Sequence, residues 1–394
     1  MAQLINDEEK NNLKKELRSF FGNGFFPWQF SSDGELRDWE TRHYDEEKYW
    51  GGFPRTPFDA SSYVLPDWAI GPFKKYDSNP IFAPDPRDWD CGHFGGGVHN
   101  GSLLRKNGLF YYIYRGEFPI PNEPRFESRR NTGITYLCDV GVAVSNDGAH
   151  FKRIAGPVLR RSEDWMYSFE DVNCVEHEGR YYLFLNRWDW LHAEDPSVCG
   201  TYLAVSDDLI HWEHKGLVFP DASRIHRNAT VVQDPHNRPV RDASGRFVMY
   251  INDRLIAYST DLLHWESKEL DSVWPGGECS IAFAHYQPEN PDHLVLFTGG
   301  NHTGHFYAEG EVLFSLQDPE KPLDWLPRPV LAADAHFPYE DGYAAEPPHQ
   351  PVSQWRDTVF VCGMTLYNGQ WYACYGGSEY YTCLATAKAH PQIS

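Results

Sequence analysis

The sequence of 394 residues lacks an apolar run long enough to span a bilayer, and it lacks an excess of basic residues. A membrane-spanning helix needs about 20 consecutive, mostly apolar residues. The 35 Lys and Arg residues are outnumbered by 56 Asp and Glu residues, which gives a formal net charge of −21. A nucleic acid or an anionic membrane would favour a basic face. We therefore expect no nucleic acid and no membrane as a partner.

The chain also lacks the features of a secreted protein. Residues 1–21 predict a charged amphipathic helix, without the apolar stretch and the cleavage site of a secretory signal. The eight cysteines are scattered, form no C-x-x-C pair and lie mostly in or beside predicted strands. This distribution favours buried free thiols over a disulfide framework or a zinc site. We expect a cytoplasmic protein.

Motifs for metals and nucleotides are absent as well. The sequence contains no H-E-x-x-H spacing and no glycine-rich phosphate loop between a strand and a helix. We therefore expect no cofactor and no metal-binding residues. A structural ion on a central axis and assembly into a homo-oligomer are both left open by the sequence.

What the chain does have is 15% aromatic residues and two repeated strand patterns. Aromatic residues favour strands, and Asp-Gly or Asp-Leu steps supply turns between them. A strand rich in aromatic and β-branched residues occurs five times, as NGLFYYIYR (107–115), EGRYYLFLN (178–186), SGRFVMYIN (244–252), DHLVLFTGG (292–300) and NGQWYACYGG (368–377). A strand, a tight turn and an aromatic residue follow each other in VAVSNDGAHF (142–151), LAVSDDLIHW (203–212) and IAYSTDLLHW (256–265).

These repeats predict an all-β fold, specifically a five-bladed β-propeller with one copy of the first pattern in each four-stranded blade. A β-sandwich is the alternative, but it would not repeat the strand–turn pair so regularly. We divide the chain into two parts. Residues 1–75 form an N-terminal helical and irregular extension packed on the propeller, and residues 76–394 form the propeller itself.

Five stretches within residues 76–388 carry a family resemblance through their order and spacing. They are VHNGSLLRKNGLFYYIYRG, GVAVSNDGAHFKRIAGPVL with FEDVNCVEHEGRYYLF, HRNATVV with YSTDLLHWE, EVLFSLQDPEKPLDWLPRPVL, and YNGQWYACYGGSEYYTCLATA. Together they resemble glycoside hydrolase family 130, the β-mannoside phosphorylases and β-mannosidases. Propellers of the arabinanase and invertase type share the strand pattern and are a rival. Their essential first-blade aspartate is Asn100 in this chain, which counts against them.

The resemblance implies which residues bind and cleave a sugar. Inverting cleavage requires a carboxylic acid that helps the leaving oxygen depart and a nucleophile on the opposite face of the sugar. Asp171, preceded by Glu170 in FEDVN, stands at the position of the family's catalytic acid. Asn100 and Arg115 stand where the family holds the sugar, and Glu379 replaces an aspartate that is a sugar ligand.

The phosphate-binding positions of the family's phosphorylases are changed in this chain. Of the family's three cationic positions, one is Asn252 in this chain and another is a glycine. The third, a lysine in the family, is missing, and Glu278 stands beside its place. Glu278 is followed by Cys279 and so also resembles the catalytic Glu-Cys pair of invertase-like propellers. We expect further substrate-binding residues and two cations that could hold phosphate or an acidic sugar. The further substrate-binding residues are Glu170, Asn252 and His302, and the two cations are Arg224 and Arg227.

The sequence therefore predicts an inverting glycoside hydrolase that acts on β-mannosides or a closely related β-linked oligosaccharide, with Asp171 as the acid and Glu278 as the base. One alternative is a β-mannoside phosphorylase, for which inorganic phosphate would be a co-substrate. The other alternative is a carbohydrate-binding propeller without turnover. In each case the predicted partner is an oligosaccharide or a glycoside.

Overall fold

The computed structural model describes residues 64–120, 136–160, 167–189, 195–252, 254–272, 274, 277–302, 305–334, 336–353 and 355–391. Their regular secondary structure consists of 20 β-strands and a short 3-10 helix, η4 (Pro338–Glu340). The prediction of an all-β fold is therefore confirmed for these residues. The predicted N-terminal helix lies outside them. No helix in the described ranges is long and apolar enough to cross a membrane.

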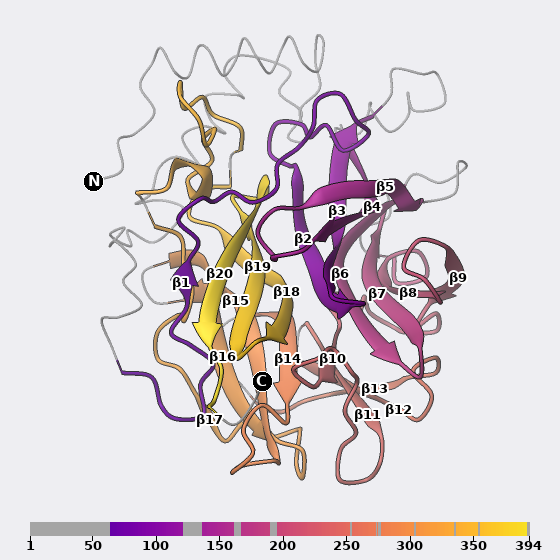
Figure 1. Cartoon of the computed structure of the whole chain (residues 1–394). Helices are drawn as coiled ribbons and strands as arrows, with labels where there is room; N and C mark the ends of the chain where they lie inside the picture. Colours follow the sequence, from indigo (N-terminus) through magenta and orange to yellow (C-terminus); the bar gives the residue numbers. More distant parts are fainter. Residues whose placement is uncertain are drawn as a thin grey trace, which may run out of the picture.

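The strands form antiparallel groups of four (Figure 1). The first group consists of β2 (Val98–Lys106), β3 (Leu109–Pro119), β4 (Tyr136–Ser145) and β5 (Lys152–Leu159). The second consists of β6 (Ser168–His177), β7 (Arg180–Trp188), β8 (Gly200–Ser206) and β9 (Trp212–Leu217). The third consists of β10 (Thr230–Gln233), β11 (Phe247–Ile251), β12 (Leu255–Ser259) and β13 (Glu266–Glu269).

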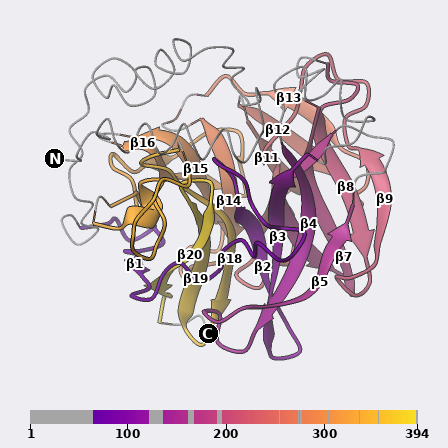
Figure 2. The same cartoon turned by 90° about the horizontal axis from the view of Figure 1, so that it is seen from above.

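The fourth group consists of β14 (Glu278–Ala284), β15 (His293–His302), β16 (His305–Ser315) and β17 (Asp324–Trp325). The last group consists of β18 (Val359–Tyr367), β19 (Gln370–Gly377), β20 (Tyr381–Lys388) and β1 (Lys74–Lys75). β10 and β14 pair in parallel, so the third and fourth groups share one eight-stranded sheet. Seen from above, β2, β14 and β18 lie toward the middle of the molecule, whereas β9 and β13 lie toward its edge (Figure 2).

The segment before β2 completes the last group. β1 pairs with β20, with Lys74 opposite Thr386, and the two strands lie side by side in Figures 1 and 2. Trp68 and Phe73 are buried in the core that the fourth and last groups share. Residues 64–75 thus pack with the strands, whereas the rest of the predicted extension lies outside the described residues.

The predicted repeats occupy equivalent places in the groups. The five aromatic stretches form the second strands β3, β7, β11, β15 and β19. The strand–turn pattern joins the third strand to the fourth in three groups. In the turn after β8, Asp208 Oδ1 accepts the backbone N–H groups of Ile210 and His211, both at 2.8 Å, and His211 Nδ1 lies 2.7 Å from Asp208 Oδ2. His211 thus helps to order this turn.

The hydrophobic core is divided among the interfaces between neighbouring groups. Separate buried clusters join the first group to the second, the second to the third, the third to the fourth and the fourth to the last. A further cluster, with Phe110 and Tyr112 of β3 and Cys374 of β19, joins the last group to the first. A large apolar side chain contributes about 1.5–3 kcal/mol when fully buried. All eight cysteines are free thiols, as predicted.

Candidate active site

A β-bulge at the same place in several first strands supplies the central residues of the candidate site. The bulges contain Asn100 in β2, Asp171 in β6, Ser280 in β14 and Cys362 in β18. Asn228 lies just before β10 and, like Asn100 and Asp171, has a φ near 50°. Residues other than glycine rarely adopt this left-handed conformation, and bulges re-aim side chains beside functional sites. No local sequence pattern marks this repeated feature.

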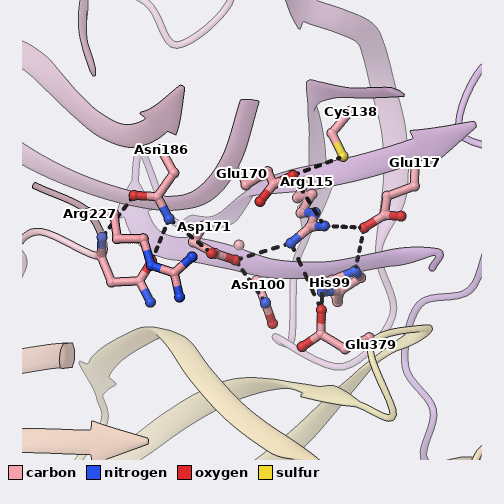
Figure 3. A network of polar contacts seen from close by, with 12 residues as sticks. His99, Asn100, Arg115, Glu117, Cys138, Glu170, Asp171, Asn186, Arg227 and Glu379 are labelled. Atoms are coloured by element: carbon pink, nitrogen blue, oxygen red, sulfur yellow. Dashed lines mark hydrogen bonds and ion pairs between the residues drawn. The ribbon is translucent and has the colours of Figure 1, made fainter. Parts of the chain in front are cut away.

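Arg115 on β3 is the centre of a buried carboxylate cluster (Figure 3). Its Nη2 atom lies 2.6 Å from Glu117 Oε1 and 3.7 Å from Glu170 Oε1. Its Nη1 atom lies 3.4 Å from Asp171 Oδ1 and 3.9 Å from Glu379 Oε2. Successive residues of a regular strand point to opposite faces, so the bulge in β6 allows Glu170 and Asp171 to face the same guanidinium group.

Burial and mutual repulsion change the acidity of these carboxyl groups. Burial raises the pKa of Glu170 to about 7, an effect that Arg115 opposes and the charge of Asp171 reinforces. Burial also raises the pKa of Glu379. At Glu117, burial is outweighed by Arg115 and by hydrogen bonds from two histidines, which hold the pKa well below its usual range. The site therefore contains both a firmly ionised carboxylate and a carboxyl group that exchanges a proton near neutral pH.

Asp171 is oriented by amide side chains. Asn100 Nδ2 donates to Asp171 Oδ1 at 2.8 Å, and Asn186 Nδ2 donates to Asp171 Oδ2 at 3.0 Å. The Asn186 amide also pairs with Asn228, whose backbone N–H donates to Asn186 Oδ1 at 2.8 Å. Asn228 Nδ2 then donates to Glu278 Oε2 at 2.6 Å. The two carboxylates predicted to be catalytic are thus connected through two asparagines.

Glu278 accepts hydrogen bonds on both of its oxygens. Arg227 Nη2 donates to Oε1 at 3.1 Å, whereas the Tyr307 hydroxyl donates to Oε2 at 2.5 Å. Together with Asn228, Glu278 therefore has three donors. The Arg227 guanidinium also lies over the ring of Trp188, 5.3 Å from its centroid. Glu278 and Arg227 form a second charged centre beside the Arg115 cluster.

No family model matches the chain. A 1,2-β-oligomannan phosphorylase of Thermoanaerobacter sp. (strain X514) is 26% identical over 316 residues, which cover 78% of this chain and 94% of that protein. A β-1,2-mannobiose phosphorylase of the same organism is 24% identical over 338 residues, which cover 77% and 93% of the two chains.

Solved structures of glycoside-active proteins share the fold. One of them is 23% identical to this chain, with a TM-score of 0.64 over 83% of this chain and 98% of that one. It is described with the GH130 family of mannoside phosphorylases, which contains glycoside hydrolases that target β-1,2 mannosidic linkages in Candida mannan. The resemblance to glycoside hydrolase family 130 is confirmed. The β-1,2-mannobiose phosphorylase of Listeria innocua is 17% identical, with a TM-score of 0.61 over 80% of this chain and 96% of that one.

The structure brings together most of the residues that the family 130 resemblance indicated. The Arg115 and Glu278 centres contain seven of them, namely Asn100, Arg115, Glu170, Asp171, Arg227, Glu278 and Glu379. Asn252 instead has a structural contact, since its Oδ1 atom accepts the backbone N–H of Cys279 at 2.8 Å. Arg224 lies 3.6 Å from Glu269 on the outer strand β13. The side chain of His302 lies outside the described residues.

Five residues of the site were missed by the sequence analysis: His99, Glu117, Asn186, Asn228 and Tyr307. Asn228 lies in HRNATVV, one of the stretches that carry the family resemblance, and Asn186 ends one of the aromatic repeats. Both positions were therefore marked by local patterns. His99 lies in VHNGSLL, another of these stretches, and Glu117 follows it, but their roles depend on contacts between separate strands. Among the described residues, no group of three or more His, Cys, Asp or Glu side chains is arranged to hold a metal ion.

Proposed function

We propose that this protein is an enzyme that cleaves β-mannosidic bonds with inversion and that Asp171 transfers a proton to the departing oxygen. The placement of Asp171 carries this proposal. Its backbone is held at a φ of 46°, and its carboxylate is oriented by Asn100 and Asn186 beside Arg115. Glu170 keeps a proton close to this carboxylate near neutral pH. The names of both curated relatives support a β-mannoside as the substrate.

We also propose that the groups of strands are the five blades of one propeller around this site. First strands of successive groups contact one another, and β18 contacts β2, so the sequence of contacts returns to its start. The core cluster between the last and first groups supports the same arrangement. β1 would then close the ring by completing the blade that contains β18, β19 and β20.

For the nucleophile, we infer inorganic phosphate. Both curated relatives are named phosphorylases, and Arg227 supplies a cation at the second charged centre. The sequence predicts Glu278 as a base that activates water. Its carboxylate already accepts hydrogen bonds from Arg227, Asn228 and Tyr307. These bonds hold the Glu278 carboxylate in place beside Arg227. In this reaction a phosphate oxygen bonds to C1 of the sugar while the glycosidic oxygen leaves with a proton from Asp171.

Hydrolysis is the second candidate, and the balance of charge in the site favours it. Glu278 would oppose a phosphate ion bound at Arg227. At an effective dielectric constant near 20, two unit charges about 4 Å apart interact by about 4 kcal/mol. A neutral water molecule would avoid this repulsion, and Glu278 would then have to act as the general base despite its hydrogen bonds.

Product analysis distinguishes the candidates. The protein is incubated with β-1,2-mannobiose, with and without inorganic phosphate, and products are followed by ¹H and ³¹P NMR from the first minutes. Phosphorolysis gives α-mannose 1-phosphate and mannose only when phosphate is present. Hydrolysis gives mannose without phosphate, with the α-anomer appearing first from the cleaved unit. Binding without any product would support a carbohydrate-binding propeller and overturn the enzymatic proposal.

A further inference from the structure

Glu379 is held toward the Arg115 cluster by an unusual turn between β19 and β20. Ser378 and Glu379 both have left-handed backbones, with φ values of 53° and 58°. Such a conformation costs about 1–3 kcal/mol for each residue other than glycine and persists only where surrounding contacts hold it. Two hydrogen bonds hold it here. The Gly342 N–H donates to Ser378 Oγ at 2.9 Å, and the Gly97 N–H donates to the Glu379 carbonyl at 3.1 Å.

His99 lies between Glu379 and a second, deeper carboxylate. The residue is fully buried on β2, directly before the bulge at Asn100. Its Nε2 atom lies 3.1 Å from Glu117 Oε1, and its Nδ1 atom lies 3.7 Å from Glu379 Oε2. The Nδ1 atom makes no hydrogen bond within the described part of the chain. Both ring nitrogens therefore face carboxylate oxygens, an environment that favours the imidazolium form.

Glu117 is a fixed anchor for this histidine. Its carboxylate also receives contacts from His93 Nε2 at 2.5 Å and from Arg115 Nη2 at 2.6 Å. The backbone at Gly96 passes so close that an added Cβ would lie 1.8 Å from Glu117 Oε2. Only glycine leaves room for the carboxylate there. Because Glu117 is held from several sides, His99 is held relative to it, and Glu379 is the partner that remains partly exposed to the site.

We propose that His99 is a positioning residue whose imidazolium, fixed by Glu117, keeps the Glu379 carboxylate ionised and directed at the bound sugar. The substrate part of this inference rests on the proposed function. An ionised Glu379 can only accept hydrogen bonds from sugar hydroxyls, whereas a protonated one presents an O–H donor. His99 would thereby determine which hydroxyl arrangement the site recognises.

The charges around the pair favour this assignment. Burial lowers the pKa of His99, but Glu379 and Glu117 outweigh it, so that the pKa is raised overall. Burial raises the pKa of Glu379, whereas His99 and Arg115 oppose that shift and Asp171 and Glu117 add to it. Tyr307 on β16 and Cys362 on β18 also interact electrostatically with Glu379. Without the charge of His99, the ionised form of Glu379 would lose one of the two cations that favour it, and Arg115 would remain. Glu379 would then take up a proton at a higher pH.

Kinetics of two His99 variants test the proposal on β-1,2-mannobiose. In His99→Gln and His99→Phe, we expect the acidic limb of the kcat/KM profile to move to higher pH by about one unit. On that limb, KM should rise about tenfold while kcat changes less. In a Glu379→Gln background the same His99 substitutions should have little further effect on KM, because the partner charge is already gone. Additive effects, or an acidic limb that does not move, would overturn the proposal.

His93→Gln is the matched control, since His93 Nε2 contacts the same Glu117 carboxylate that holds His99. This variant should leave the acidic limb in place. A shift as large as that of the His99 variants would show that the effect arises from loosening Glu117, and it would contradict the role given to His99.

An NMR titration tests the pairing without turnover. The His99 imidazole signal, identified as the one of 18 that disappears in His99→Gln, should titrate about one unit lower in Glu379→Gln than in the unmodified protein. An unchanged titration would refute the pairing even in an active enzyme. A lowered titration in a protein that cleaves no β-mannoside would support the pairing and refute the proposed function.

Discussion

The outer turns and the Arg115 cluster pair histidine with a carboxylate at similar distances but in different surroundings. His211 lies 2.7 Å from Asp208 in an outer turn, where the two side chains are 86% and 49% exposed. His99 lies 3.1 Å from Glu117 inside, where the side chains are 0% and 2% exposed. Exposed ion pairs contribute about 0–1 kcal/mol, whereas desolvation of a buried pair can exceed its attraction. The outer pairs therefore order a turn, and the inner network is better explained by function than by stability.

The largest difference between the two regions should appear when a cation is removed. Arg115→Met leaves Glu117, Glu170, Asp171 and Glu379 without their shared partner, which should cost about 3–5 kcal/mol of unfolding free energy. Arg180→Met is the outer control, because Arg180 pairs with Asp207 where the side chains are 45% and 80% exposed. It should cost at most about 1 kcal/mol. Urea unfolding measures both, and equal losses would remove the distinction.

The pH dependence of stability should have opposite signs at buried Glu309 and at an outer turn. Buried Glu309 on β16 accepts from Ser280 and from the Val361 N–H, and burial raises its pKa to about 8. The folded state therefore binds this proton more tightly than the unfolded state, and the stabilisation is lost as pH rises from the ordinary value toward 8. From about pH 5 to pH 9, the free energy of unfolding of Glu309→Gln should rise by about 4 kcal/mol relative to that of the unmodified protein. Parallel stability curves would contradict this.

A smaller and opposite effect is expected at an outer turn. Hydrogen bonds from His211 and from backbone N–H groups hold the pKa of Asp208 well below its usual range. The stability that this carboxylate contributes is present above its ordinary pKa and is lost as pH falls. Asp208→Ala should cost about 1 kcal/mol at neutral pH, as loss of a comparable cap does. Thermal unfolding should show the cost shrinking in strong acid, and a constant cost would indicate that the charge has no part in it.

The comparison also explains how much could be predicted from sequence. The outer turns and the second strands depend on local patterns, and the prediction of a strand over NGLFYYIYR or a turn at Asp208 needed no distant residue. Asp171 was located through the family resemblance. His99 and Glu117 could not be found, because a bulge and the pairing of β2 with β3 bring them together. Arg224 and Arg227 were equivalent in sequence, but their side chains contact Glu269 on β13 and Glu278 on β14 respectively.

The central claim is that Asp171 donates the proton, and the kcat/KM of Asp171→Asn on β-1,2-mannobiose with phosphate tests it most directly. The substitution retains the shape of the side chain but removes the acid. We predict a fall of about 10²–10⁴ in kcat/KM, the usual contribution of a general acid, with the cooperative unfolding transition preserved. Asp208→Asn in the outer turn should retain the activity of the unmodified protein. If Asp171→Asn keeps more than about a tenth of that activity, Asp171 is not the proton donor.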